Sequence, residues 1–183
     1  KVLSIKMTLY RVSSIDSPIV NSLINAAKNG KHVTVLIEIK ARFDEDRNLS
    51  LIDKLRNGGV NVILGLEYMK THCKMCIITR KEDDGVRIYS HIGTGNYNEK
   101  TARIYTDISY LTAKRKMGMD LSMIFNLLSG MSSPNEKLNK LFYAPVNLRS
   151  QINKLIDTEI ENVKSGGKGF IFLKLNSLSE TEI

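Results

Sequence analysis

His72 and Lys74 are the residues of this sequence whose types and spacing best suit chemistry on phosphate. They form an H-x-K pattern at the start of an expected strand, where alternation puts both side chains on one face. An imidazole is a competent nucleophile toward phosphorus, and an adjacent ammonium stabilises the negative phosphoryl oxygens. A surface histidine at the start of a strand would give the same letters, so the pattern alone does not establish a nucleophile.

A second candidate group lies at the end of the next expected strand, where His91 is followed by the turn Gly93-Thr94-Gly95-Asn96. Glycines let backbone N–H groups approach an anion, and Asn96 adds a polar donor. An ordinary glycine-rich turn is the alternative. If the two expected strands are neighbours, they bring His72, Lys74 and His91 to one place.

Arg11 and Arg42 each follow a strand that we expect in a parallel α/β layer. Loops at the carboxyl ends of such strands are where ligands bind, and guanidinium groups suit phosphate oxygens. The alternatives are a solvated loop for Arg11 and an ion pair with Asp44 or Glu45 for Arg42. The acidic run 44–46 is interpreted as the start of a helix and not as a metal site.

Tyr105 and Asp107 are two residues apart in a segment expected to be a strand, 105–111, so they would share one face. Tyr105 could stack on a nucleotide base, and Asp107 could hold the far nitrogen of a catalytic histidine. A core tyrosine and a capping aspartate are the alternative interpretation.

Cys73 and Cys76 have the spacing of a zinc or redox motif. In a strand, however, residues three apart point to opposite faces, and the sequence has no second Cys/His pair to complete a zinc site. We therefore expect two reduced thiols, as in a cytoplasmic protein.

Strands and helices alternate through the first third of the chain. Expected strands cover 2–10, 32–39 and 60–64, with expected helices at 17–30 and 48–57, an order typical of an α/β layer with parallel strands. The pattern then changes to a hairpin of strands 74–80 and 86–92, followed by a helix at 119–128. The sequence thus predicts an α/β domain with a mixed sheet flanked by helices.

The segment Ser132-Ser133-Pro134-Asn135 is the best linker candidate, and a domain boundary is expected near residue 146. The first domain would cover 1–146. Residues 147–183 would begin a second domain, with a short strand at 140–144 before its helix (148–164) and another strand at 170–175. The sequence opens within a strand-like pattern without an initiator Met, so we interpret it as a piece of a longer protein.

Composition is that of an ordinary globular protein: 183 residues, 42% hydrophobic and 25% charged, with a formal net charge of +8. The positive balance favours anionic partners, without choosing between nucleotides, polyphosphate, nucleic acid and membrane surfaces. No apolar run is long enough to span a bilayer, and no signal peptide is visible.

Five blocks of sequence resemble one known family, the first polyphosphate kinase family. They are LYR at 9–11, EIKARFDE at 38–45, KTHCK at 70–74, HIGTGNYNEKTARIYTD at 91–107 and LFYAPVNLR at 141–149, in order across nearly the whole chain. The resemblance implies a phospholipase D-like fold in which two such domains form one site. It also implies a phosphotransferase that moves the γ-phosphate of ATP reversibly onto inorganic polyphosphate through a phosphohistidine.

The resemblance assigns roles by position. His72 matches the phosphorylated histidine, His91 a second important histidine, and Tyr105 the tyrosine that packs on adenine. Arg11 and Arg42 match arginines near Mg²⁺, where they would bind phosphates and not the metal itself, since a guanidinium has no lone pair to give. By the same resemblance ATP/ADP and polyphosphate, not nucleic acid, are the partners. The parent would be a cytoplasmic homo-oligomer, with attachment to the membrane surface left open.

Two departures bear on function. A phospholipase D pattern has Asp five residues after the Lys of H-x-K, and Thr79 stands there, which disfavours a phosphodiesterase or nuclease. Only one H-x-K occurs in the 183 residues, so the second histidine of a two-domain site is missing. The alternatives to the kinase remain a phospholipase D-type phosphodiesterase and a polyanion-binding module without catalysis. The chain by itself is expected to be inactive.

Overall fold

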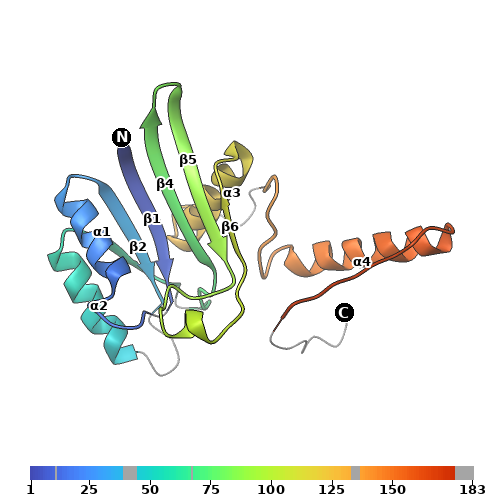
Figure 1. Cartoon of the computed structure of the whole chain (residues 1–183), viewed down its shortest axis with the longest axis horizontal. Coiled ribbons are helices and arrows are strands. Elements are labelled where there is room, and N and C mark those ends of the chain that lie inside the picture. Colours follow the sequence, from blue (N-terminus) through green and yellow to red (C-terminus); the bar gives the residue numbers. More distant parts are fainter. Residues whose placement is uncertain (11, 39–44, 67, 133–136, 176–183) are drawn as a thin grey trace. The chain divides into compact units, whose positions relative to one another are not determined.

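The computed structural model describes residues 1–10, 12–38, 45–66, 68–132 and 137–175. The chain divides into two compact units, residues 1–140 and residues 141–183. The first unit is built on a six-stranded sheet with the strand order β3-β2-β1-β4-β5-β6. Figure 1 shows β2, β1, β4, β5 and β6 side by side in this order. The expected α/β fold with a mixed sheet flanked by helices is confirmed.

One half of the sheet is parallel, as the alternating pattern predicted. It contains β1 (Val2–Leu9), β2 (His32–Ile37) and β3 (Asn61–Leu64), which run parallel to one another. Helices α1 (Pro18–Lys28) and α2 (Glu45–Asn57) connect them. Both helices pack their apolar side chains on the sheet face that carries Val35, so the core of this half is a continuous apolar cluster.

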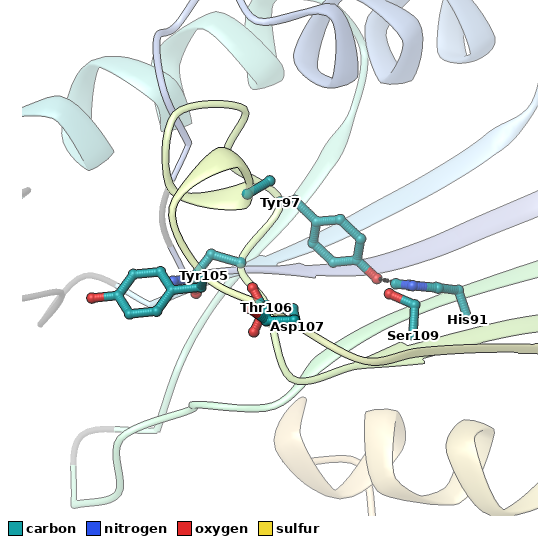
Figure 2. Close-up of a pocket in the computed structure, with 9 residues that line it drawn as sticks. His91, Tyr97, Tyr105, Thr106, Asp107 and Ser109 are labelled. Carbon is teal, nitrogen blue, oxygen red and sulfur yellow. Dashed lines mark hydrogen bonds between the residues drawn. The ribbon is translucent and has the colours of Figure 1, made fainter. Parts of the chain in front are cut away.

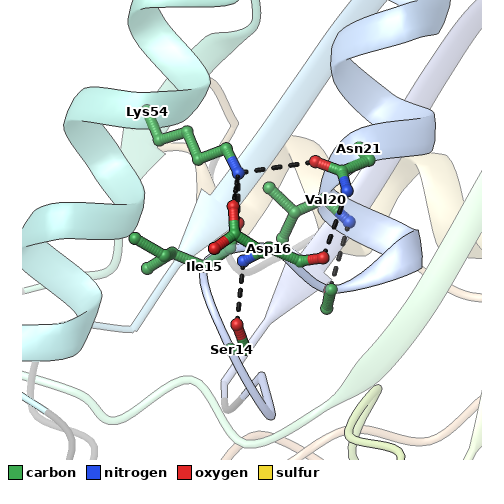
Figure 3. Close-up of polar contacts among 7 residues, drawn as sticks. Ser14, Ile15, Asp16, Val20, Asn21 and Lys54 are labelled. Carbon is green, nitrogen blue, oxygen red and sulfur yellow. Dashed lines mark hydrogen bonds and ion pairs between the residues drawn. The ribbon is translucent and has the colours of Figure 1, made fainter.

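Helix α1 begins as its sequence predicts. Ser17 accepts a hydrogen bond from the Val20 backbone N–H at 3.3 Å, and Pro18 takes the first helical position. The loop before it is tied to α2 by Lys54, whose Nζ donates to the Ile15 carbonyl at 2.8 Å and pairs with Asp16 at 2.5 Å (Figure 3). Because Asp16 is exposed, this ion pair mainly fixes the loop and contributes little free energy.

The other half of the sheet is antiparallel. Strands β4 (Lys74–Glu82) and β5 (Gly85–Gly93) form the predicted hairpin, and β6 (Ser109–Thr112) adds to β5. The expected strand 105–111 is wrong at its start, so Tyr105 and Asp107 do not share a strand face. The hydrogen bonds of Ile108 go to Thr94 and close a loop: its carbonyl accepts from the Thr94 N–H and its N–H donates to the Thr94 hydroxyl, both at 3.0 Å.

Helix α3 (Arg115–Leu128) covers the opposite face of the sheet. Its buried Leu121 and Phe125 lie on the side that carries Lys6, whose ammonium is 5.4 Å from the centre of the Phe125 ring. The helix begins four residues earlier than expected and includes Gly118, which lies directly against Ile88 of β5. The absence of a Cβ at this position lets the helix approach the strand.

A buried carboxylate holds the last residues of the first unit. Asp120 of α3 is fully buried and accepts hydrogen bonds from the backbone N–H groups of Asn139, at 2.9 Å, and Lys140, at 2.6 Å. A buried carboxylate is tolerated when its oxygens are satisfied in this way. These bonds fix the segment 139–140 to α3.

The second unit contains α4 (Leu148–Lys164), the long helix that the sequence predicted. The strands expected at 140–144 and 170–175 are wrong: the described residues of both segments form no strand. Apolar side chains there stay exposed, including Phe170 and Phe172, and α4 has no buried residue. A strand needs a neighbouring strand for its backbone groups, and the described part of this unit supplies none. Among the described residues, no helix is both long and apolar enough to cross a membrane.

Candidate phosphoryl-transfer site

Lys74 and the turn that follows His91 lie at one edge of the sheet. The parallel strands β1 and β2 end there, and the antiparallel β4 begins there, because Met7 pairs with Cys76 and therefore places Leu9 beside Lys74. Strand β5 ends at the same edge, where Gly93 pairs with Lys74. The described residues before β4 and after β5 thus lie where an α/β sheet usually binds ligands.

His72 and Lys74 meet as their spacing predicts. The Lys74 ammonium lies 3.0 Å from Nδ1 and 3.2 Å from Nε2 of the His72 ring, and it donates to the His72 carbonyl at 2.5 Å. Lys74 is buried, with 4% of its surface exposed. A cation this well removed from water next to an imidazole forms a site where a phosphoryl group would find both a nucleophile and a counter-charge.

Tyr10 is a neighbour of His72 that sequence reasoning missed. Its ring meets the His72 ring edge-on, with centroids 4.9 Å apart, and the Lys74 ammonium is 5.3 Å from its centre. Tyr10 is itself buried at the end of β1. Its position could have indicated this role, because Tyr10 directly precedes Arg11 in the block 9–11, of which only the arginine was considered.

The backbone around His72 is held by two buried polar side chains. Thr8 of β1 donates from its hydroxyl to the Cys73 carbonyl at 2.8 Å and accepts from the Met75 N–H at 3.1 Å. Glu38, which follows β2, accepts from the Thr71 N–H at 2.6 Å. Glu38 was also missed by the sequence analysis. An acidic residue directly after a buried strand is unusual, so its position could have been recognised from the sequence. These bonds fix the residues on both sides of His72.

His91 lies on the adjacent strand but is not directly opposite His72, since its cross-strand partner is Cys76. Its Nδ1 is 2.7 Å from the hydroxyl oxygen of Tyr97, a third residue that the sequence analysis missed. Burial lowers the pKa of His91 below its usual value, and burial raises the pKa of Tyr97 well above its usual value. At neutral pH both groups are therefore uncharged.

A pocket of about 520 Å³ opens beside His91, within the size range of small-ligand sites. Its lining comes from the end of β5, the loop 94–108 and the start of β6, and includes His91, Asn96, Tyr97, Tyr105, Asp107 and Ser109. Figure 2 shows the Tyr105 ring pointing away from the His91–Tyr97 pair. Tyr105 is 56% exposed, which leaves its ring free to stack on a planar group.

Asp107 and Asn96 both line this pocket. The Asp107 carboxylate accepts from the Thr94 hydroxyl at 2.9 Å, and among the described residues it makes no hydrogen bond to His72, the partner that was expected. The Asn96 side-chain oxygen is buried without a partner among the described atoms. The catalytic assignment of Asp107 and the binding assignment of Asn96 stay predictions.

Arg11 and Arg42 lie outside the described residues, and so does the alternative ion pair of Arg42 with Asp44 or Glu45. Cys73 and Cys76 are both free thiols, and burial raises the pKa of each to about 11. Among the residues that the structure describes, no group of three or more His, Cys, Asp or Glu side chains is arranged to hold a metal ion.

The fold defines the class of protein. The phospholipase D family member Nuc from Salmonella typhimurium matches 72% of this chain and 80% of its own length, with a TM-score of 0.54 and 17% identity. At this identity the likeness shows the fold alone. The chain is therefore an α/β protein of phospholipase D-like fold.

The family follows from closer relatives. Residues 1–134 match the family described as polyphosphate kinase C-terminal domain 1, and residues 141–183 match C-terminal domain 2. The chain belongs to the polyphosphate kinase family. The polyphosphate kinases of Lactiplantibacillus plantarum and Synechocystis sp. are each 50% identical over 182 residues, which is 100% of this chain and 25% of either relative.

A solved structure agrees with this assignment. The crystal structure of polyphosphate kinase from Porphyromonas gingivalis matches 99% of the chain with a TM-score of 0.84 and 37% identity, and the match covers 30% of that structure's chain. The sequence thus spans about a quarter of the length of the relatives that it matches.

Proposed function

We propose that this chain forms part of a polyphosphate kinase that transfers the γ-phosphate of ATP to inorganic polyphosphate through a phosphohistidine at His72. The observation that carries the proposal is the buried ammonium of Lys74, 3.0 Å from a ring nitrogen of His72. A lysine that donates to an imidazole nitrogen requires a free lone pair on that nitrogen. The same lone pair is what a nucleophile needs.

In the first half of the reaction, an unprotonated ring nitrogen of His72 attacks the γ-phosphorus of ATP. The N–P bond forms while the bond from the γ-phosphorus to the bridging oxygen breaks, and the electron pair leaves with ADP. In the second half, a terminal oxygen of polyphosphate attacks the phosphorus, the P–O bond forms, the N–P bond breaks and His72 is regenerated. Lys74 compensates the phosphoryl charge in both halves.

The nucleotide binds, in this proposal, across the pocket beside His91. Tyr105 has an exposed ring at its margin that suits an adenine base. Asn96 has a buried oxygen that finds no partner among the described residues and that suits a donor on the ligand. Arg11 and Arg42 would bind the phosphates.

The magnesium enters with the nucleotide as part of the substrate. The described carboxylates do not converge as they do in a protein-built site, whereas phosphate oxygens are ligands that Mg²⁺ prefers. In this proposal the longer protein is a cytoplasmic homo-oligomer, and the second unit begins a further phospholipase D-like domain that supplies the rest of the site.

The test is phosphate labelling of the longer protein with γ-labelled ATP and Mg²⁺, followed by mapping of the acid-labile label. We expect the label on His72, and His72→Ala should abolish it and lower polyphosphate synthesis by several orders of magnitude. His32→Ala is the matched control, since His32 is exposed at the start of β2, away from the site edge. Undiminished labelling of His72→Ala would place the nucleophile elsewhere.

A further inference from the structure

We propose that Tyr97 is a positioning residue whose hydroxyl donates to Nδ1 of His91 and thereby keeps the His91 proton on Nε2, where it can be donated to an anionic oxygen bound in the pocket. The assignment of the tautomer stands on the geometry alone. The identity of the anion, a nucleotide or polyphosphate oxygen, rests on the function proposed above.

The contact itself is short and well oriented. The Tyr97 oxygen is 2.7 Å from Nδ1 of His91, and the two ring centroids are 5.5 Å apart with the rings tilted by 54°. Figure 2 shows the Tyr97 hydroxyl directed at the His91 ring. The partners come from different elements, His91 from β5 and Tyr97 from the loop that follows it. The bond therefore links the strand to the pocket wall.

The direction of the bond follows from the chemistry of its two partners. A neutral imidazole has one acceptor nitrogen and one N–H, and its acceptor nitrogen is a stronger base than a phenol oxygen. Tyr97 packs against the apolar core, and no other hydrogen bond of its hydroxyl is found among the described residues. If His91 donated instead, the phenol proton would have no described acceptor, which is costly for a half-buried hydroxyl.

The surroundings keep both partners in the required state. Burial raises the pKa of Tyr97, which holds its proton, and lowers the pKa of His91, which stays neutral. Opposite His91 on β4 stands Cys76, a thiol whose pKa of about 11 leaves it uncharged. Asp107 is the charged group of the pocket lining, and its carboxylate is bound to Thr94.

The Nε2 edge of the ring is the one left for a ligand. A Cβ added at Gly93 would lie 3.3 Å from Cε1 and 3.5 Å from Nε2 of His91, so this edge of the ring lies beside a residue that has no side chain. With Nδ1 occupied by Tyr97, a neutral His91 presents one N–H to the pocket. Such a donor suits phosphate oxygens without adding a charge that must be desolvated.

The experiment reads the tautomer directly. The chain has three histidines, so ¹⁵N-histidine NMR of the 183-residue protein at mildly alkaline pH resolves each ring, and His91→Gln assigns the signals. We expect His91 to show a protonated Nε2 and an unprotonated, hydrogen-bonded Nδ1. In Tyr97→Phe the Nδ1 signal should move to that of a free imidazole and the ring should populate both tautomers. Tyr89→Phe, which loses a hydroxyl bonded to Glu82, is the matched control and should leave His91 unchanged.

A second readout uses the longer polyphosphate kinase. There Tyr97→Phe should lower kcat/KM for ATP by about tenfold, the effect expected for loss of one hydrogen bond that orients a reacting group. Labelling of His72 should persist. A protonated Nδ1 on His91 in the unaltered protein, or unchanged signals and an unchanged kcat/KM in Tyr97→Phe, would overturn the proposal. Failure of His72 labelling would overturn the proposed function and leave the tautomer result standing.

Discussion

The residues at the site edge act through close polar contacts that leave little room for substitution. Lys74 is buried beside His72, and Glu38 and Thr8 hold the backbone around it. In the proposed reaction, a nucleophile held in this way would approach a phosphoryl group without first losing freedom of motion. Enzymes that transfer phosphoryl groups accelerate the reaction mainly by positioning the reacting groups and by neutralising charge. In the proposed reaction these supporting bonds are therefore as important for the rate as the nucleophile itself.

Gly95 provides a test at the same scale. A Cβ at this position would lie 2.3 Å from Oδ2 and 2.6 Å from Cγ of Asp107. We expect Gly95→Ala to rotate Asp107 away and break its hydrogen bond with Thr94, lowering the free energy of unfolding by about 0.5–1.5 kcal/mol. Urea denaturation measures this change.

The control for Gly95 removes the obstructing side chain. In an Asp107→Gly background the added Cβ meets neither the carboxylate nor the Asp107 Cβ, which would lie 3.0 Å away, so Gly95→Ala should cost nothing further. An equal cost in both backgrounds would show that Gly95 is required for a reason other than its contact with Asp107.

At the scale of elements, the packing of α3 on β5 depends on a missing side chain. Gly118 lies inside the helix, and a Cβ there would come within 2.7 Å of Cγ2 and 2.9 Å of Cβ of Ile88. Alanine is the better helix former by about 1 kcal/mol. The overlap should outweigh this gain, since overpacking costs about 1–3 kcal/mol and the Cβ of Ile88 is fixed to its strand.

Gly118→Ala should therefore destabilise the protein, as measured by thermal or urea unfolding. In an Ile88→Gly background the same substitution should become neutral or stabilising, because both the Cγ2 and the Cβ of Ile88 are then gone. A stabilising effect of Gly118→Ala in the unaltered protein would contradict the close approach of α3 and β5.

At the scale of the whole molecule, the two units differ in how complete they are. The first unit has an apolar core on one sheet face and α3 on the other. In the second, α4 buries no residue and Phe170 and Phe172 are exposed. Since the chain spans 25% of its relatives, we propose that the rest of a second domain covers these side chains.

The 183-residue chain should accordingly fold but not synthesise polyphosphate. It has one H-x-K, which leaves the phosphates without the groups of the opposite half-site. Its charge of +8 should still bind polyphosphate weakly, and this binding should fall steeply with added salt. The measurement compares chain and longer protein in an ATP-to-polyphosphate assay, with polyphosphate binding at low and high salt. Synthesis by the chain near the rate of the longer protein would refute a site shared between two domains.

Local pattern was enough to predict most helices and strands of the first unit and its mixed α/β sheet. Three signals each depend on only a few neighbouring residues and can therefore be recognised in the sequence. They are the β-branched run of β2, the Ser17-Pro18 start of α1 and the short turn between β4 and β5. The H-x-K spacing likewise placed Lys74 beside His72. The prediction of a phosphotransferase came from the family resemblance and not from these local patterns.

Tertiary structure decided which distant residues support the site. Tyr10 beside His72, Glu38 on Thr71 and Tyr97 on His91 come from different strands and loops, and no spacing rule connects them. It also showed where a strand-like pattern forms no strand. The apolar run at 170–175 has no neighbouring strand among the described residues, and at 105–108 the hydrogen bonds between Ile108 and Thr94 close a loop instead. A strand is completed by its partner, and the partner is chosen by the fold as a whole.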